Sequence, residues 1–123
     1  MRYVDGYVLP VPKKKLEAYR RLAQAAGKIW REHGALQYVE SVGDDLNVKF
    51  GTPFRRVIEL KPGETVIFAW IVFKSRAHRD SVNVKVMKDP RLAKMMENMA
   101  DPKSSLFDHK RMVYGGFKII VDV

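Results

Sequence analysis

The residues best suited to chemistry lie near the two ends of the chain, in two apolar stretches that contain glycine. The first is RYVDGYVL (residues 2–9) and the second is KRMVYGGFKIIV (residues 110–121). Asp5 stands between Val4 and Gly6, so a strand covered on both faces would bury its carboxylate, which is costly for an unpaired charge. If burial outweighs a basic partner, the pKa of Asp5 rises and its carboxylate becomes a candidate general base. A structural ion pair is the favoured interpretation.

A second group of polar residues occupies SRAHRDSVN (residues 75–83), which is predicted to begin a helix. Arg79 and Asn83 are four positions apart and share one helix face, where they could hold a carboxylate or an enolate oxygen. His78 is the second candidate for proton transfer, because imidazole titrates near neutral pH. The alternative is ordinary pairing on the helix surface. The basic residues predicted to pair with Asp5 or with a ligand are Arg79, Lys110 and Arg111.

Three glycines interrupt the two terminal strands: Gly6, Gly115 and Gly116. Glycine inside a strand weakens it and marks a bulge or a close approach. The two strands are neighbours in the fold proposed below, so one interpretation is a thin region of sheet that leaves a hollow for a small ligand. The residues that would bound this hollow are Tyr3, Asp5, Tyr7 and Tyr114. The favoured interpretation is structural: bulges at the glycines let the sheet curl toward closure.

Composition excludes several classes of site. The 123 residues include no cysteine, which rules out disulfides, thiolate metal sites and thiol nucleophiles. The histidines at 33, 78 and 109 lack the spacing of a metal site, and no P-loop or Rossmann glycine motif is present. We therefore expect neither a metal nor a cofactor. The net charge of +9 is spread along the chain without a long run of like charges, which favours a solvated basic surface.

Hydrophobic periodicity and Gly/Pro punctuation predict the element order β-α-β-β-α-β. The expected strands cover residues 2–9, 35–42, 65–73 and 110–121, the first of them ended by Pro10 and Pro12. The expected helices cover residues 13–33 and 75–88, with a further helix starting at Asp89-Pro90. Residues 43–63 and 101–109 are expected to be irregular, with room for a short element within 54–60. This order predicts one α+β domain, residues 1–123, with a ferredoxin-like sandwich.

The two helices of such a fold can cover only one of the two faces of its sheet. TVIFAWIVF (residues 65–73) is apolar on both alternating sides, and the last strand is similar. Both helices lie on one face, so the other face would expose a large apolar patch. A second copy, packed sheet against sheet, is the simplest cover, and we expect a homodimer. The apolar run 66–73 is too short to cross a bilayer and no signal-peptide core is evident, so we expect a cytoplasmic protein without a membrane partner.

Three stretches resemble the signature sequences of a known family. YVDGYV, IFAWIVFKSRAHRDSVNVKVMKDPRL and FDHKRMVYGGF are similar, in this order, to those of the YbaA-like proteins, a family of unknown function. The resemblance covers nearly the whole chain. The family is placed in the dimeric α/β-barrel superfamily, which includes small cofactor-independent monooxygenases and haem-degrading enzymes. The resemblance implies ferredoxin-like protomers whose two sheets close into a barrel, and it implies no particular reaction.

Three functions stay open. The leading hypothesis is a homodimer that binds or transforms a small organic molecule without a cofactor, with Asp5 or His78 moving the proton in the enzymatic case. The second is a non-catalytic dimeric binding module. The third is RNA binding, because FAWIVF (residues 68–73) resembles the last six positions of the third strand of an RNA-recognition motif, with Trp70 in place of the inner aromatic residue. Val66 and Ile67 replace the basic residue and glycine of that motif, and a dimer would close the face that RNA needs.

Overall fold

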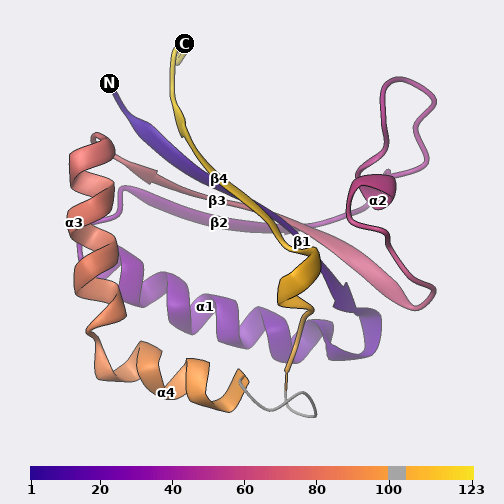
Figure 1. Cartoon of the computed structure of the whole chain (residues 1–123), viewed down its shortest axis with the longest axis horizontal. Coiled ribbons are helices and arrows are strands. Elements are labelled where there is room, and N and C mark those ends of the chain that lie inside the picture. The colour runs from indigo at the N-terminus through magenta and orange to yellow at the C-terminus, as the bar shows by residue number, and fades with distance from the viewer. Residues whose placement is uncertain (100–104) are drawn as a thin grey trace.

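The computed structural model describes residues 1–99 and 105–123. Its strands are β1 (Tyr3–Pro12), β2 (Gln37–Val42), β3 (Glu64–Phe73) and β4 (Val113–Lys118) (Figure 1). Its helices are α1 (Leu16–Glu32), α2 (Phe54–Val57), α3 (Arg76–Met87) and α4 (Pro90–Met99), with 3₁₀ turns η1 (Lys13–Lys15) and η2 (His109–Arg111). The predicted α+β class and its ferredoxin-like element order are confirmed.

The four strands form one antiparallel sheet in the order β2-β3-β1-β4. The two terminal strands are therefore neighbours, as predicted, and Gly6 lies directly opposite Gly115. The register between the described strands runs without an extra residue on either side, from Tyr3 opposite Lys118 to Val8 opposite Val113. The bulges predicted at the glycines are thus wrong, and the glycines need another explanation.

Helices α1, α3 and α4 cover one face of the sheet, and the other face is more open (Figure 1). The core on the helix side contains the fully buried Phe73, Val82 and Val86, which join β3 to α3. Burying each such side chain contributes about 1.5–3 kcal/mol. Helix α2 lies near the opposite face, where the ring of Phe54 is 5.8 Å from that of Phe68. Among the described residues, no helix is long and apolar enough to span a membrane.

The ends of α1 and α3 follow the signals predicted from sequence. The Ser75 hydroxyl accepts a hydrogen bond from the backbone N–H of His78 at 3.1 Å, which caps α3. Gly34 follows α1 with a φ of +117°, a conformation that favours glycine. These signals are local, so the sequence alone was sufficient to place both boundaries.

Several predicted boundaries are wrong; the last strand ends at Lys118 rather than at residue 121, and α1 begins at Leu16 after the η1 turn rather than at residue 13. Strand β1 continues through Pro10 and Pro12, because β4 pairs with it only as far as Val8 and leaves that side of β1 without a neighbour. Proline lacks an N–H, which costs no ladder hydrogen bond where the nitrogen faces an unpaired edge. Strand β4 begins at Val113 rather than at residue 110, because Asp108 caps the η2 turn by accepting from the backbone N–H of Lys110 at 2.9 Å. Within the predicted 101–109 loop, residues 101–104 lie outside the described residues.

Candidate functional site

Asp5 is fully buried on the helix-facing side of β1, and it is held by α3. Arg79 Nη1 lies 3.3 Å from Asp5 Oδ1, and Asn83 Nδ2 donates to Asp5 Oδ2 at 3.5 Å. The helical spacing of Arg79 and Asn83 indicated a pair able to hold a carboxylate. In the structure the carboxylate that they hold is the chain's own.

Tyrosine and tryptophan side chains extend this cluster on both sides. Arg79 donates to the hydroxyl of Tyr114 at 3.1 Å and to that of Tyr3 at 3.3 Å, and its guanidinium lies 4.9 Å from the centre of the Tyr3 ring. On the other side, Trp30 Nε1 donates to Asn83 Oδ1 at 3.0 Å. The network therefore links α1, α3, β1 and β4 around one buried charge, and removing a member would leave a buried polar group unpaired.

The electrostatics of this cluster are dominated by burial. Burial raises the pKa of the Asp5 carboxyl, and the Arg79 cation together with hydrogen bonds from Asn83 and Tyr114 opposes that rise only in part. The pKa of Tyr114 is also raised, first by burial and then by the negative charge of Asp5. A carboxyl with a raised pKa inside a polar cluster is typical of acid–base sites, but also of structural ion pairs.

One of the three glycines, Gly116, makes room for an aromatic ring. A Cβ on Gly116 would lie 2.5 Å from the Tyr3 hydroxyl and 2.7 Å from its ring, so the Tyr3 side chain fills the space above this glycine. Gly6 and Gly115 face the opposite side of the sheet, where a Cβ would meet the ring of Phe117 at 3.7 Å and 3.5 Å, respectively. The Tyr3 side chain therefore fills the space above Gly116 on the helix-facing side, whereas a Cβ at Gly6 or Gly115 would make only ordinary contacts.

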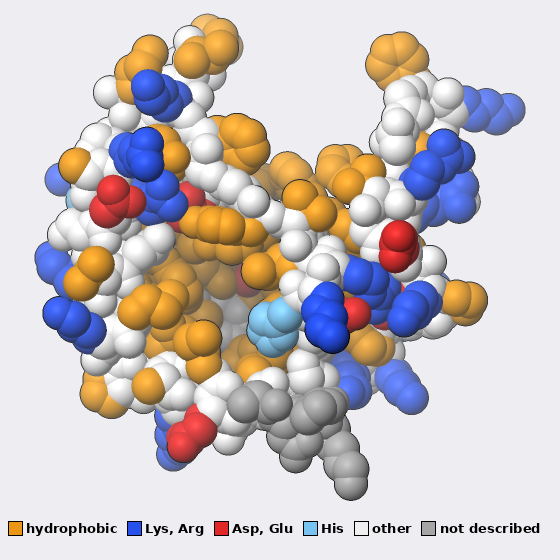
Figure 2. Space-filling model, viewed as in Figure 1, with side chains coloured by type: hydrophobic (Ala, Val, Ile, Leu, Met, Phe, Trp, Pro, Cys, Tyr) orange, Lys and Arg blue, Asp and Glu red, His pale blue; other side chains and the backbone are white. Residues whose placement is uncertain are grey.

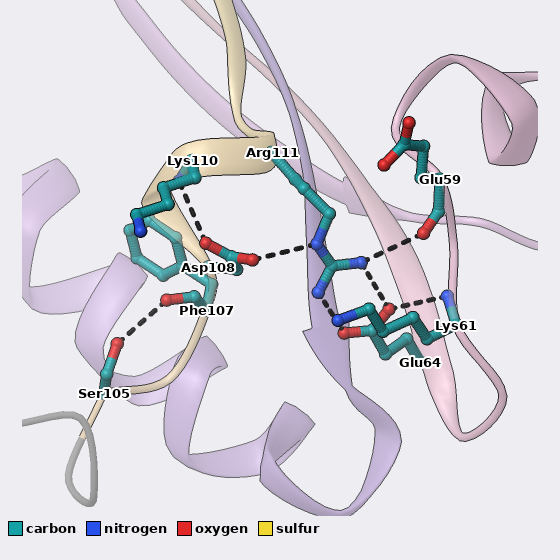
Figure 3. Close-up of polar contacts among 8 residues, drawn as sticks. All are labelled: Glu59, Lys61, Glu64, Ser105, Phe107, Asp108, Lys110 and Arg111. Carbon is teal, nitrogen blue, oxygen red and sulfur yellow. Dashed lines mark hydrogen bonds and ion pairs between the residues drawn. The ribbon is translucent and has the colours of Figure 1, made fainter.

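The remaining predicted site residues lie outside the Asp5 cluster. His78 Nδ1 accepts from the backbone N–H of Lys74 at 3.0 Å, and the pKa of His78 is lowered by burial, with a smaller contribution from nearby lysines. Arg111 binds Glu64 through two hydrogen bonds of 2.7 and 2.6 Å (Figure 3). Arg111 also contacts the Asp108 carboxylate, and Lys110 contributes its backbone to the same turn. Arg111 therefore ties the segment before β4 to β3.

A cavity of about 590 Å³ lies between the helix-facing side of the sheet and helices α1 and α4. Hydrophobic side chains line this hollow between sheet and helices (Figure 2). Its described lining is mostly aromatic and methionine side chains, among them Tyr7, Trp30, Tyr38, Met95, Met96 and Met99. Tyr7 and Trp30 also connect the cavity to the Asp5 cluster, because the Tyr7 ring lies 4.9 Å from that of Tyr114 and Trp30 holds Asn83.

Glu40 of β2 is the polar centre of the cavity wall, and the sequence did not single it out. The hydroxyls of Tyr19 and Tyr38 donate to its two carboxylate oxygens, the latter at 2.6 Å. Burial, followed by the charge of Glu40, raises the pKa of both tyrosines, so their hydroxyls stay protonated donors. Gly27 of α1 allows the contact, because a Cβ there would lie 2.6 Å from the Tyr38 ring. The available signal was the i, i+2 spacing of Tyr38 and Glu40, which places both on one strand face.

The described residues contain no group of histidine and acidic side chains able to hold a metal ion. The side chains at the two clusters are instead hydroxyl, amide, guanidinium and carboxylate groups, which bind organic molecules and protons. The site chemistry thus consists of one deeply buried carboxylate and one carboxylate on the wall of an apolar cavity.

Comparison with known proteins agrees with the fold and does not assign an activity. Over 99% of its length the chain is 42% identical to the uncharacterized protein YbaA of Escherichia coli K12, of which it covers 99%, and equally to that of Shigella flexneri. In structure it is similar to an uncharacterized NIPSNAP domain protein from Burkholderia xenovorans (TM-score 0.56, 11% identity, 95% and 93% of the two chains covered). It is also similar to a dimeric ferredoxin-like protein from an uncultured marine organism (TM-score 0.54, 9% identity, 99% and 98% covered). A family model described as "Protein of unknown function (DUF1428)" matches residues 2–104, and the chain therefore belongs to this family.

Proposed function

We propose that this protein is a homodimer that binds a small, largely apolar organic molecule in the cavity between its sheet and helices α1 and α4. The observation that supports this ligand site most strongly is the cavity itself. Its volume of about 590 Å³ lies within the range of about 300–1,000 Å³ typical of small-molecule sites. Its lining has the composition of such sites, an apolar wall with few polar groups. Neither a metal nor a cofactor is part of this proposal.

Proton transfer to or from a bound molecule is a second proposal with narrower support. The raised pKa of Asp5 favours it, since a general base or acid works best when its pKa approaches the working pH. Asp5 has no exposed surface, however, and its carboxylate is occupied by Arg79 and Asn83. A ligand would have to exchange protons with Asp5 through Tyr114, which is 47% exposed. The alternative predicted from sequence, a structural ion pair between Asp5 and a basic residue, does not require proton exchange through Tyr114.

The homodimer is supported by the apolar character of the open sheet face. Phe68, Val113 and Phe117 point to this face and are 43%, 45% and 60% exposed. Hydrophobic side chains also line the concave upper edge of the molecule (Figure 2). The marine neighbour is described as dimeric, which adds support for a partner of the same kind. RNA binding would use the same face in an uncovered protomer, so sedimentation of the free protein separates the two hypotheses.

The ligand site is tested by filling it. Ala26 lines the cavity, so an Ala26→Phe variant places a ring inside it, whereas Ala18→Phe adds the same ring to an exposed position of the same helix. Isothermal titration with phenylbutanol, a small aromatic alcohol, is expected to show one site per chain in the wild type and in Ala18→Phe. Ala26→Phe should weaken this binding by about tenfold or more, because the ring occupies the same volume. Unchanged binding in Ala26→Phe, or no binding to the wild type, would contradict the proposal.

A further inference from the structure

We propose that the ligand of this cavity is an organic cation, an amine with an apolar body whose ammonium group pairs with Glu40. This inference rests on the proposed function, namely that the cavity binds a small molecule, and adds the charge that the molecule carries. It follows from three features of the described lining: its carboxylate, the position of the basic residues and the aromatic rings around the carboxylate.

The first feature is a carboxylate whose charge is not neutralised. Glu40 is the one acidic residue on the described cavity lining, and within residues 1–99 and 105–123 it forms no ion pair. Its hydrogen-bond donors are the hydroxyls of Tyr19 and Tyr38, which are neutral. These hydroxyls orient the carboxylate but leave its negative charge available, and a carboxylate oxygen has lone pairs for a further donor.

The second feature is where the basic residues lie. The chain has 23 lysine and arginine residues, and none of those described lines this cavity. Arg20, Lys28 and Arg31 line a neighbouring groove instead, which shares Tyr19, Tyr38 and Glu40 with the cavity. Arg20 pairs there with Glu17, and Arg31 donates to a backbone carbonyl. A carboxylate or phosphate ligand would therefore find no lysine or arginine in the cavity, and the His109 imidazole is the one basic group on the described lining that could offset its desolvation.

The third feature is the set of aromatic rings around the two tyrosines that bind Glu40. The Tyr38 ring lies 6.0 Å from the Trp30 ring, and the Tyr19 ring lies 5.9 Å from that of Phe107. All four rings line the cavity. Ammonium groups are attracted to aromatic faces, and desolvation strengthens that attraction. A carboxylate between aromatic rings thus matches a protonated amine better than it matches a neutral or anionic group.

Three compounds that share one skeleton test the charge preference. Phenylbutylamine, phenylbutanol and phenylbutyrate carry a phenyl ring on the same four-carbon chain, with a head group that is cationic, neutral or anionic, respectively, at neutral pH. The amine is expected to bind the wild-type protein about tenfold more tightly than the alcohol, because a hydrogen bond to a charged group exceeds a neutral one by about that factor. Phenylbutyrate is expected to bind more weakly than both. Isothermal titration at one pH and one ionic strength gives all three constants.

Two variants assign the preference to Glu40. Glu40→Gln is expected to weaken amine binding about tenfold and to leave alcohol binding within about twofold, since the amide still accepts from a tyrosine but lacks the charge. Glu97→Gln makes the same change of net charge at an exposed position of α4 and should alter neither constant. A thermal melt of each variant shows whether it folds, and the comparison of the three compounds on the wild type does not depend on any variant.

The outcomes separate this inference from the proposed function. Equal affinity of the wild type for the amine and the alcohol, both weakened by Ala26→Phe, would overturn the cation preference and leave the ligand site standing. An amine preference that persists in Glu40→Gln would overturn the role of Glu40. Binding of none of the three compounds would overturn both.

Discussion

Replacing Arg79 by methionine tests the electrostatic account of the Asp5 cluster most severely. Methionine keeps much of the arginine stem and removes the cation, so Asp5 remains fully buried and loses its one ion-pair partner among the described residues. Asn83 still donates to the Asp5 carboxylate, but a neutral amide does not balance its charge. We therefore expect Arg79→Met to destabilise the fold through an uncompensated buried charge.

The magnitude follows from the geometry of the pair. Arg79 Nη1 lies 3.3 Å from Asp5 Oδ1, a separation at which two unit charges attract by about 5 kcal/mol for an effective dielectric constant of about 20. The Arg79 side chain is 15% exposed, so water screens part of this attraction. Removing one partner of a buried pair costs about 3–5 kcal/mol, and the lower end of that range, about 3 kcal/mol in the free energy of unfolding, is expected here.

The sign of the pH dependence distinguishes this effect from ordinary loss of packing. Burial raises the folded-state pKa of Asp5 above its ordinary value of 3.8, and loss of the Arg79 cation raises it further. The folded protein then binds more protons at this group than the unfolded protein does. The penalty is complete above the folded-state pKa and disappears as the pH falls to about 3.8. The stability deficit of Arg79→Met should therefore shrink on acidification.

Urea unfolding followed by tryptophan fluorescence, at one protein concentration, measures the deficit. With a slope of about 2 kcal/mol per molar urea, the midpoint of Arg79→Met should fall by about 1.5 M at neutral pH, and by progressively less as the pH is lowered toward 3.8, the ordinary pKa of Asp. Adding Asp5→Asn should recover most of the loss and remove its pH dependence. Arg20→Met, at an exposed pair with Glu17, is the matched control and should change nothing measurable. An equal deficit with and without Asp5→Asn, or one that grows on acidification, would show that the lost stability does not come from the unpaired charge of Asp5.

Two further predictions concern the sheet. Gly116→Ala should destabilise the fold by about 1–3 kcal/mol, because its Cβ would clash with the buried Tyr3, whereas Gly115→Ala on the same strand should be nearly neutral by urea unfolding; equal effects would contradict the close packing of Tyr3. Phe68→Asp, on the open face, should convert the proposed dimer to a monomer in sedimentation, whereas Phe50→Asp, a 95% exposed control, should not. A wild type that sediments as a monomer at micromolar concentration would remove the dimer and favour RNA binding.

Much of the fold was predictable from sequence because its signals are local. The β-α-β-β-α-β order follows from hydrophobic periodicity interrupted by glycine and proline, and the Ser75 cap is a relation over three residues. Arg79 and Asn83 were predictable as a pair for the same reason, since a helix places residues four apart on one face. The end of β1 was predicted too early, because a proline interrupts a strand only where a neighbouring strand needs its N–H. Strand β4 pairs with β1 only as far as Val8, so the prolines after it interrupt nothing.

The parts that could not be predicted depend on contacts between distant segments. Gly116 is needed because the Tyr3 ring lies above it on the neighbouring strand, which no feature of GGF reveals. Arg111 looked like a partner for Asp5, but it lies beside Glu64, 47 positions away. In the sequence, Glu40 looks like an ordinary strand residue. Its role depends on the Tyr19 side chain, which α1 places against it. Each of these roles is set by the docking of elements rather than by spacing along one element.

The most direct test of the ligand site is a crystal structure of this chain soaked with phenylbutanol. We expect density for the compound between the helix-facing side of the sheet and helices α1 and α4, in contact with Trp30 and Met95. The same crystals should show whether a second copy covers Phe68 and Phe117. An empty cavity at saturating compound, or density only on the open sheet face, would show that this cavity is not the ligand site.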